Sequence, residues 1–230
     1  MRKLYLVPII HMSADMGSLA SALEAGATAG LGQELWQKHK EIVSDFWDSV
    51  AQFFDSLDVN GFRVYQDGLV ANGPDGLRIV REGISQESKN YEIVGKLLER
   101  GAALVRTEDL ALVKQEHTYI ARIARSKSLK EKEAAALRYK LVQSKLLKQR
   151  DDFIAQRIEE TLSEGETGIL FIGAYHDVIP KLPRDIGVKE VKKAVKVRGY
   201  QQLLSKPRRD EVQFKQLSEY LSSPVTLKQS

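Results

Sequence analysis

Cysteine is absent from the 230-residue chain. Without thiols, the protein has no disulfide bonds, no thiolate nucleophile and no cysteine-ligated zinc or iron–sulfur site. Any metal would therefore have to be held by histidine, aspartate, glutamate or water. The phosphate-binding patterns Gly-x-x-x-x-Gly-Lys-Ser/Thr and Gly-x-Gly-x-x-Gly are also missing, which argues against a phosphate-binding enzyme.

Long apolar runs are missing as well, since none approaches the roughly 20 residues that span a bilayer. The apolar stretch after Lys3 is interrupted by Pro8 and His11, and no small-residue cleavage site follows it. We therefore predict a first β-strand rather than a signal peptide, a cytoplasmic location and no membrane partner. The net charge of +4 is too small and too dispersed to indicate a nucleic-acid partner.

The composition is that of a globular protein, with 43% hydrophobic and 29% charged residues. A chain of this length can bury one substantial core, so we predict a single domain over residues 1–230. Short apolar runs alternate with helical patterns, which is typical of an α/β fold with a mixed, mostly parallel central sheet flanked by helices. The runs that predict strands are residues 3–10, 62–66, 102–105 and 168–172.

Two stretches have the pattern of long helices. Over residues 33–57, apolar and aromatic side chains recur every three or four positions, which indicates one buried face. His39 stands between two lysines on this helix, and we expect it to be solvated. Residues 109–163 predict a helical insertion, either a long crossover helix or half of a helical hairpin that projects from the sheet. These long helices would offer a surface for a homo-oligomer.

Two of the four histidines come at or just beyond the ends of strand candidates. His11 comes after the run 3–10, and His176 comes shortly after the run 168–172. Open α/β sheets bind their ligands outside the carboxyl ends of the strands. If the two strands are parallel neighbours, the two imidazoles face each other at one edge of the sheet.

Acidic residues close the other two strand candidates, Asp67 after residues 62–66 and Glu108 after residues 102–105. Two imidazoles and a carboxylate suit a divalent metal with open coordination positions, which can activate water for hydrolysis. His11, His176 and Asp67 are therefore the candidate metal ligands, and Glu108 is a candidate acid–base partner. For each residue alone, the alternative is a structural role as a loop cap, a turn residue or a solvated charge.

The segment Gly173-Ala174-Tyr175-His176 resembles the Gly-x-x-His motif that closes the conserved region of the TraB/PrgY/Tiki proteins. Residues 149–158 resemble the helix that these proteins place before that strand, and residues 4–11 resemble their first strand. At the end of the first strand, Pro8 stands where the family's Gly-x-x-His motif has glycine. In the helix segment, Gln149 stands where an acidic residue is expected before Arg150. The family looks related to the erythromycin esterases and to the haem-binding ChaN lipoproteins.

This resemblance implies a hydrolytic site. Members of the family resemble metal-dependent peptidases, and their esterase relatives use a histidine as the general base for a water molecule. By the same resemblance, Arg150 would bind a substrate carboxylate or a developing oxyanion with its planar fork of donors. The metal would be manganese, cobalt or zinc.

Two hypotheses of different classes follow. In the first, the protein is a hydrolase of a peptide or ester bond, metal-dependent, with five catalytic candidates: His11, Asp67, Glu108, Arg150 and His176. In the second, the same sheet edge binds a small molecule, a peptide or a haem-like group without catalysis, and the long helices bind a partner. A bound metal that is lost when both histidines are replaced would favour the hydrolase.

Overall fold

The computed structural model describes residues 1–10, 28–206 and 208–226 of the chain. Within these ranges five strands form one sheet in the order β3-β2-β4-β1-β5, with every neighbouring pair parallel. The predicted α/β fold is confirmed, and a fully parallel sheet replaces the mostly parallel one that we expected. The strands are β1 (Arg2–Ile9), β2 (Arg63–Gln66), β3 (Ala103–Val105), β4 (Thr167–Gly173) and β5 (Ile186–Glu190).

The central strand β4 is apolar without alternation because both of its faces are covered. Ile169 and Phe171 point into the core on one side of the sheet, and Leu170 and Ile172 point into the core on the other. A strand with this environment has no solvated face on which polar residues would be stable. The run of apolar residues therefore marks the middle of the sheet.

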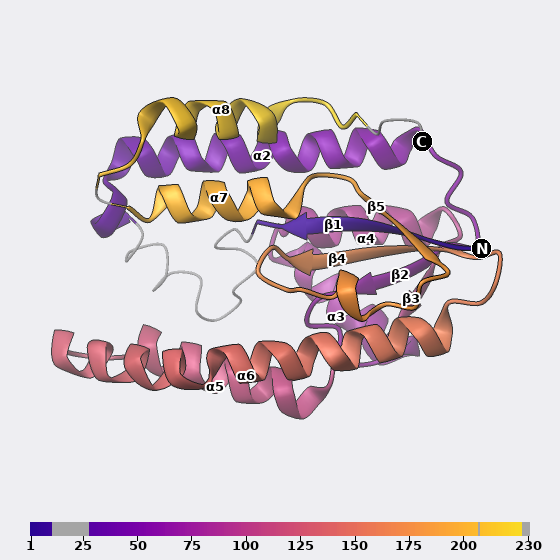
Figure 1. The fold of residues 1–230 in the computed structure, drawn as a ribbon, viewed down its shortest axis with the longest axis horizontal. Helices are drawn as coiled ribbons and strands as arrows, with labels where there is room; N and C mark the ends of the chain where they lie inside the picture. Colours follow the sequence, from indigo (N-terminus) through magenta and orange to yellow (C-terminus); the bar gives the residue numbers. More distant parts are fainter. Residues whose placement is uncertain (11–27, 207, 227–230) are drawn as a thin grey trace.

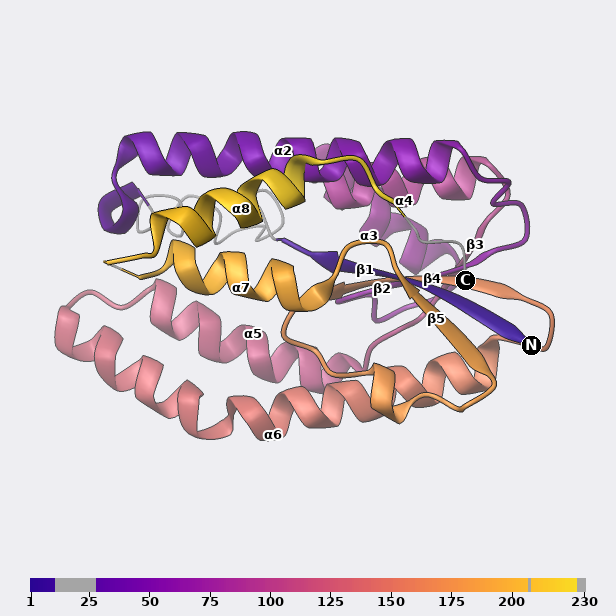
Figure 2. The same cartoon turned by 45° about the horizontal axis from the view of Figure 1, so that its top comes forward.

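Helices cover the two faces of the sheet as separate layers (Figures 1 and 2). One layer contains α2 (Gln33–Asp55), α3 (Gly73–Ser85), α4 (Lys89–Glu99), α7 (Ala194–Leu204) and α8 (Glu211–Ser222). The second half of α6 (Leu129–Thr161) covers the other face through Ile154 and Ile158, near the short 3-10 helix η2 (Ile179–Lys181). No helix among the described residues has the length and apolar character needed to cross a bilayer.

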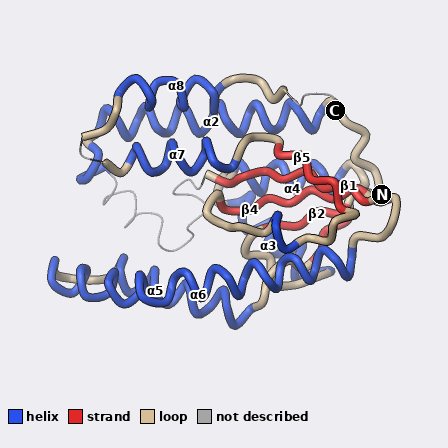
Figure 3. The backbone as a smooth tube through the Cα atoms, viewed as in Figure 1, coloured by secondary structure: helices blue, strands red, loops and turns tan. Residues whose placement is uncertain are grey.

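α5 (Leu110–Ala124) and α6 form an antiparallel helical hairpin, which occupies most of the segment where the sequence predicts a helical insertion. Figure 3 shows this hairpin extending past the carboxyl ends of the strands. Local capping defines where its helices start: Asp109 accepts from the backbone N–H of Ala111 at 2.9 Å, and Ser128 accepts from that of Glu131 at 3.2 Å. The carboxyl edge of the sheet thus lies beside two helices that can add side chains to it.

His39 is buried in α2, and the prediction of a solvated residue is wrong. It is 6% exposed, and its Nδ1 lies 2.9 Å from the hydroxyl of Tyr200. Burial lowers the pKa of His39 to about 4, so the ring is neutral at physiological pH. The flanking lysines misled the prediction, because the helical period places His39 on the same face as Ile42 and Phe46, in the core.

Gly83 allows α3 and α4 to pack closely. A Cβ at this position would lie 2.4 Å from Cγ and 2.9 Å from Cβ of Tyr91, which is too close for any side-chain rotation to relieve. We expect Gly83→Ala to lower the free energy of unfolding by about 1–3 kcal/mol through overpacking. Urea denaturation measures this loss.

The matched control is Gly30→Ala, which is also helical but has nothing within 4 Å of the added Cβ. Alanine has the higher helix propensity, so this variant should be neutral or slightly stabilised. An equal loss at both glycines would show that packing against Tyr91 is not the cause.

Candidate functional site

Six ionisable side chains meet at the carboxyl-terminal edge of the sheet, and we call this group the strand-end cluster. Three of them follow strands β2, β3 and β4, and three lie on α5 and α6. Parallel strands bring their carboxyl ends to one edge, where the loops and the hairpin helices converge. The members are Asp67, Glu108, Glu116, Arg150, Asp151 and His176.

Backbone hydrogen bonds fix the two carboxylates that follow β2 and β3. Oδ2 of Asp67 accepts from the backbone N–H of Gly173 at 3.0 Å, which ties the end of β2 to the end of β4. The backbone N–H of Glu108 donates to the carbonyl of Leu69 at 3.0 Å, which ties the loop after β3 to the loop after β2. The carboxylate of Asp67 and the backbone of Glu108 are therefore fixed at this edge of the sheet.

His176 is oriented by Asp151. Its Nδ1 lies 2.5 Å from Oδ1 of Asp151, while Oδ2 of the same carboxylate accepts from the backbone N–H of Asp177 at 3.0 Å. An imidazole that donates from Nδ1 presents Nε2 to the rest of the site, and Nε2 lies 3.7 Å from Oδ2 of Asp67. Burial opposes the charged form, but the bond to Asp151 and the charge of Asp67 outweigh it, so the pKa of His176 is raised.

Arg150 joins three carboxylates. Its Nη2 donates to Oδ1 of Asp67 at 2.5 Å, its Nε donates to Oε1 of Glu108 at 3.1 Å, and its Nη1 donates to Glu116. The side chain is only 7% exposed. Burial disfavours the cation, but the surrounding carboxylates raise the pKa of Arg150 and keep it charged. Because its donors are bonded to protein carboxylates, Arg150 holds Asp67, Glu108 and Glu116 in place.

Glu108 carries a carboxyl oxygen without a partner. The side chain is fully buried, and among the described residues its Oε2 has no hydrogen-bond partner. Burial, with the negative charge of Asp67, raises the pKa of Glu108 to about 7, although Arg150 acts in the opposite direction. The pKa of this carboxyl group therefore lies near neutral pH. A buried oxygen without a partner is available to a ligand.

Asp67, Glu108 and His176 can hold a metal ion. Each offers one ligand atom that lies within 4.8 Å of those of the other two. Carboxylate oxygens and an imidazole nitrogen form a ligand set that divalent transition metals accept. A histidine ligand usually donates its second ring N–H to a carboxylate, and the bond from His176 to Asp151 has this form.

The structure brings together four of the residues that the sequence singled out: Asp67, Glu108, Arg150 and His176. His11, the fifth, lies outside the described residues.

Glu116 and Asp151 were not singled out from the sequence. Asp151 had a usable signal, because it follows Arg150 in the helix that precedes β4 and lies within the segment that resembles the TraB/PrgY/Tiki proteins. Glu116 had none, because it is one acid among the polar residues of α5. Its role depends on how α5 packs against α6, which spacing along a single helix does not define.

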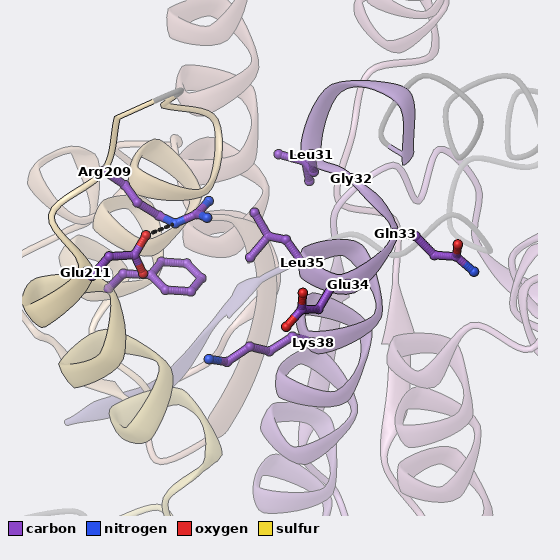
Figure 4. A pocket seen from close by; sticks show the side chains of 9 residues that line it. Leu31, Gly32, Gln33, Glu34, Leu35, Lys38, Arg209 and Glu211 are labelled. Atoms are coloured by element: carbon purple, nitrogen blue, oxygen red, sulfur yellow. Dashed lines mark hydrogen bonds and ion pairs between the residues drawn. The ribbon is translucent and has the colours of Figure 1, made fainter.

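A pocket of about 430 Å³ lies between the start of α2 and the start of α8, away from the strand-end cluster (Figure 4). Its walls include Lys38 of α2 and Arg209 before α8. Arg209 pairs with Glu211 at 2.7 Å and lies 5.1 Å from the ring centroid of Phe214, so its charge is already compensated within the protein. None of the residues that line this pocket belongs to the strand-end cluster.

A scan against protein-family models, a search of curated proteins and a search of solved structures found no match to this chain. The resemblance to the TraB/PrgY/Tiki proteins therefore stays a sequence prediction. The geometry of the strand-end cluster is the firmer basis for a functional assignment.

Proposed function

We propose that the strand-end cluster binds a divalent metal and that the protein is a hydrolase of a peptide or ester bond. The main support is the orientation of His176. Its Nδ1 is occupied by Asp151, and its Nε2 faces the carboxylate of Asp67 at the edge of the sheet. Glu108 adds a carboxylate oxygen within 4.8 Å of the ligand atoms of the other two residues, and among the described residues its Oε2 has no hydrogen-bond partner.

In this proposal each protein residue has a defined task. Asp67, Glu108 and His176 would hold the metal, which when bound lowers the pKa of a coordinated water and polarises a substrate carbonyl. Asp151 keeps a proton on Nδ1 of His176 and fixes the plane of the ring. Arg150 balances the charge of the carboxylates and holds Asp67 and Glu108 side by side, because its Nη2 donates to both. Glu108 releases its proton when a cation arrives, since its pKa is close to neutral.

The chemical class of the metal follows from the donors. Two carboxylates and one imidazole suit manganese, cobalt or zinc better than a soft metal that requires thiolates. The choice of a peptide or ester bond rests on the resemblance to peptidase-like and esterase families, because the strand-end cluster itself does not distinguish these substrates.

Asp151→Asn tests the proposal. The asparagine keeps the shape of the side chain but weakens the bond that orients His176, and losing such a partner typically weakens metal binding or activity by about 10–100-fold. Metal-free protein should be titrated with Mn²⁺, Co²⁺ and Zn²⁺ by isothermal calorimetry. The metal-loaded protein should then be assayed on a panel of peptides and esters.

Asp152→Asn is the matched control, because Asp152 is the next residue of α6 and pairs with Lys181 near the surface. This variant should bind metal and act on substrate as the wild type does. The proposal fails if wild-type protein takes up none of the three metals, or if both variants weaken binding equally.

A second function is favoured by one observation. Arg150 already supplies a cation to both Asp67 and Glu108, so the strand-end cluster is partly balanced without a metal. In that case the sheet edge would belong to a non-catalytic binding or regulatory module. The metal titration separates the two functions, because the binding module requires no uptake and no hydrolysis.

A further inference from the structure

The far end of the α5–α6 hairpin contains a second pocket, distinct from the strand-end cluster. It has a volume of about 420 Å³ and lies where the chain turns from α5 into α6. We call it the arginine pocket, because three of its seven lining residues are arginines. The lining consists of Arg122, Arg125, Ser126, Glu131, Ala134, Ala135 and Arg138.

No acidic side chain of the described residues pairs with the three guanidinium groups. Within the described part of the chain, Arg122, Arg125 and Arg138 take part in no ion pair and no side-chain hydrogen bond. Other arginines of these two helices differ: Arg157 pairs with Glu160 at 2.5 Å, and Arg150 binds three carboxylates. Three uncompensated cations around one pocket repel each other, and an anion between them would relieve that repulsion.

The one acid in the lining, Glu131, offsets only one of the three positive charges and forms no ion pair with the arginines. Oε2 of Glu131 accepts from the backbone N–H of Lys127 at 2.9 Å, a contact that closes the turn between the helices. Ser126 donates its hydroxyl to the carbonyl of Arg122 at 2.8 Å, which also holds this turn. The pocket therefore keeps a positive excess while its polar turn residues are engaged elsewhere.

Small side chains make the space available. Ala134 and Ala135 line the pocket on α6, and Ala135 is buried in the contact between the two helices. An alanine leaves room that a longer side chain would fill, so the arginines of both helices border an open volume. This volume lies in the range of about 300–1,000 Å³ that is usual for small-molecule sites.

We propose that the arginine pocket binds a small phosphorylated ligand. Guanidinium groups present planar forks of donors that match phosphate oxygens in pairs, and lysine does not offer this geometry. The pocket has no aromatic residue on which a nucleic-acid base could stack, which favours a compact anion over a strand of nucleic acid. The inference is independent of the proposed hydrolase, because it involves none of the residues of the strand-end cluster.

Calorimetric titration of metal-free protein with inorganic pyrophosphate, at about 0.15 M salt to screen weak surface attraction, tests this proposal. We expect saturable binding to the wild type. The variant with Arg122→Gln, Arg125→Gln and Arg138→Gln should bind at least tenfold more weakly. A variant with lysine at the same three positions keeps the charge but loses the forks, and it should also bind more weakly than the wild type.

The matched control replaces three exposed lysines of the same hairpin, Lys130, Lys132 and Lys140, by glutamine. It removes the same charge and should change the affinity by less than twofold. Circular dichroism confirms that each variant is folded. The proposal is overturned if the wild type shows no saturable binding, if the lysine control loses as much affinity as the arginine variant, or if citrate binds as tightly as pyrophosphate.

Discussion

Replacing Arg150 by methionine is expected to lower the free energy of unfolding of the metal-free protein by about 3–5 kcal/mol. The methionine fills much of the same volume and keeps a good helix propensity, so the change mainly removes the cation. Asp67, Glu108 and Glu116 then lose the donor that they share. Buried carboxylates without a partner are costly, because neither water nor another charge solvates them.

Arg138→Met is the control for this result. Arg138 lies on the same helix but is exposed and unpaired in the described structure, so its replacement should change stability by no more than about 0.5 kcal/mol. Urea denaturation near pH 7.5 gives both values. A loss of less than about 1 kcal/mol for Arg150→Met would mean that the carboxylates tolerate the missing cation, by protonation or by hydration.

The same variant bears on the proposed function. A divalent cation that binds Asp67 and Glu108 would replace part of the lost charge, and a ligand that binds the folded state stabilises it by mass action. Adding the metal should therefore recover part of the stability that Arg150→Met loses. No recovery in the presence of millimolar metal would favour the non-catalytic binding module.

The contrast between β4 and α6 explains which features were predictable. β4 is a short run whose neighbours are turns, and its burial on both faces is visible as an unbroken apolar sequence. The residue after such a strand reaches the carboxyl edge whatever the helices do, so Asp67, Glu108 and His176 could be proposed from their positions alone. The order of the strands in the sheet could not be predicted from the sequence and is known only from the structure.

α6 changes its environment along its length, and this hides its functional residues. Its first half packs on α5 and leaves Leu137 and Leu141 exposed, whereas its second half packs on the sheet through Ile154 and Ile158. A single helical period therefore does not describe which residues are buried. Arg150 stands at the end of a basic run that is mostly solvated, yet it points inward. Spacing predicts which residues share a face, but not which face the sheet covers.

The stability of the metal-free protein is expected to fall as the pH rises from about 5 to 8. Burial raises the pKa of Glu108 from 4.5 to about 7, so between these values the folded state holds a proton that the unfolded state has lost. The stabilisation that this proton gives is complete below the pKa that Glu108 has in the unfolded state. It is lost as the pH rises through the pKa that Glu108 has in the folded state. The difference corresponds to about 3 kcal/mol, at about 1.4 kcal/mol for each tenfold change in the equilibrium. His176, whose pKa is also raised, acts in the same direction.

Glu108→Gln isolates the contribution of this carboxyl group. Glutamine resembles the protonated acid in shape and charge, so the variant should match the wild type near pH 5 and exceed its stability by up to about 3 kcal/mol at pH 8. Glu133→Gln on the exposed part of α6 is the control and should follow the wild type at every pH. Urea denaturation between about pH 5 and 8 measures the free energy of unfolding of all three proteins. Parallel curves for the wild type and Glu108→Gln would mean that Glu108 is ionised throughout, and that Arg150 stabilises its charge more than burial opposes it.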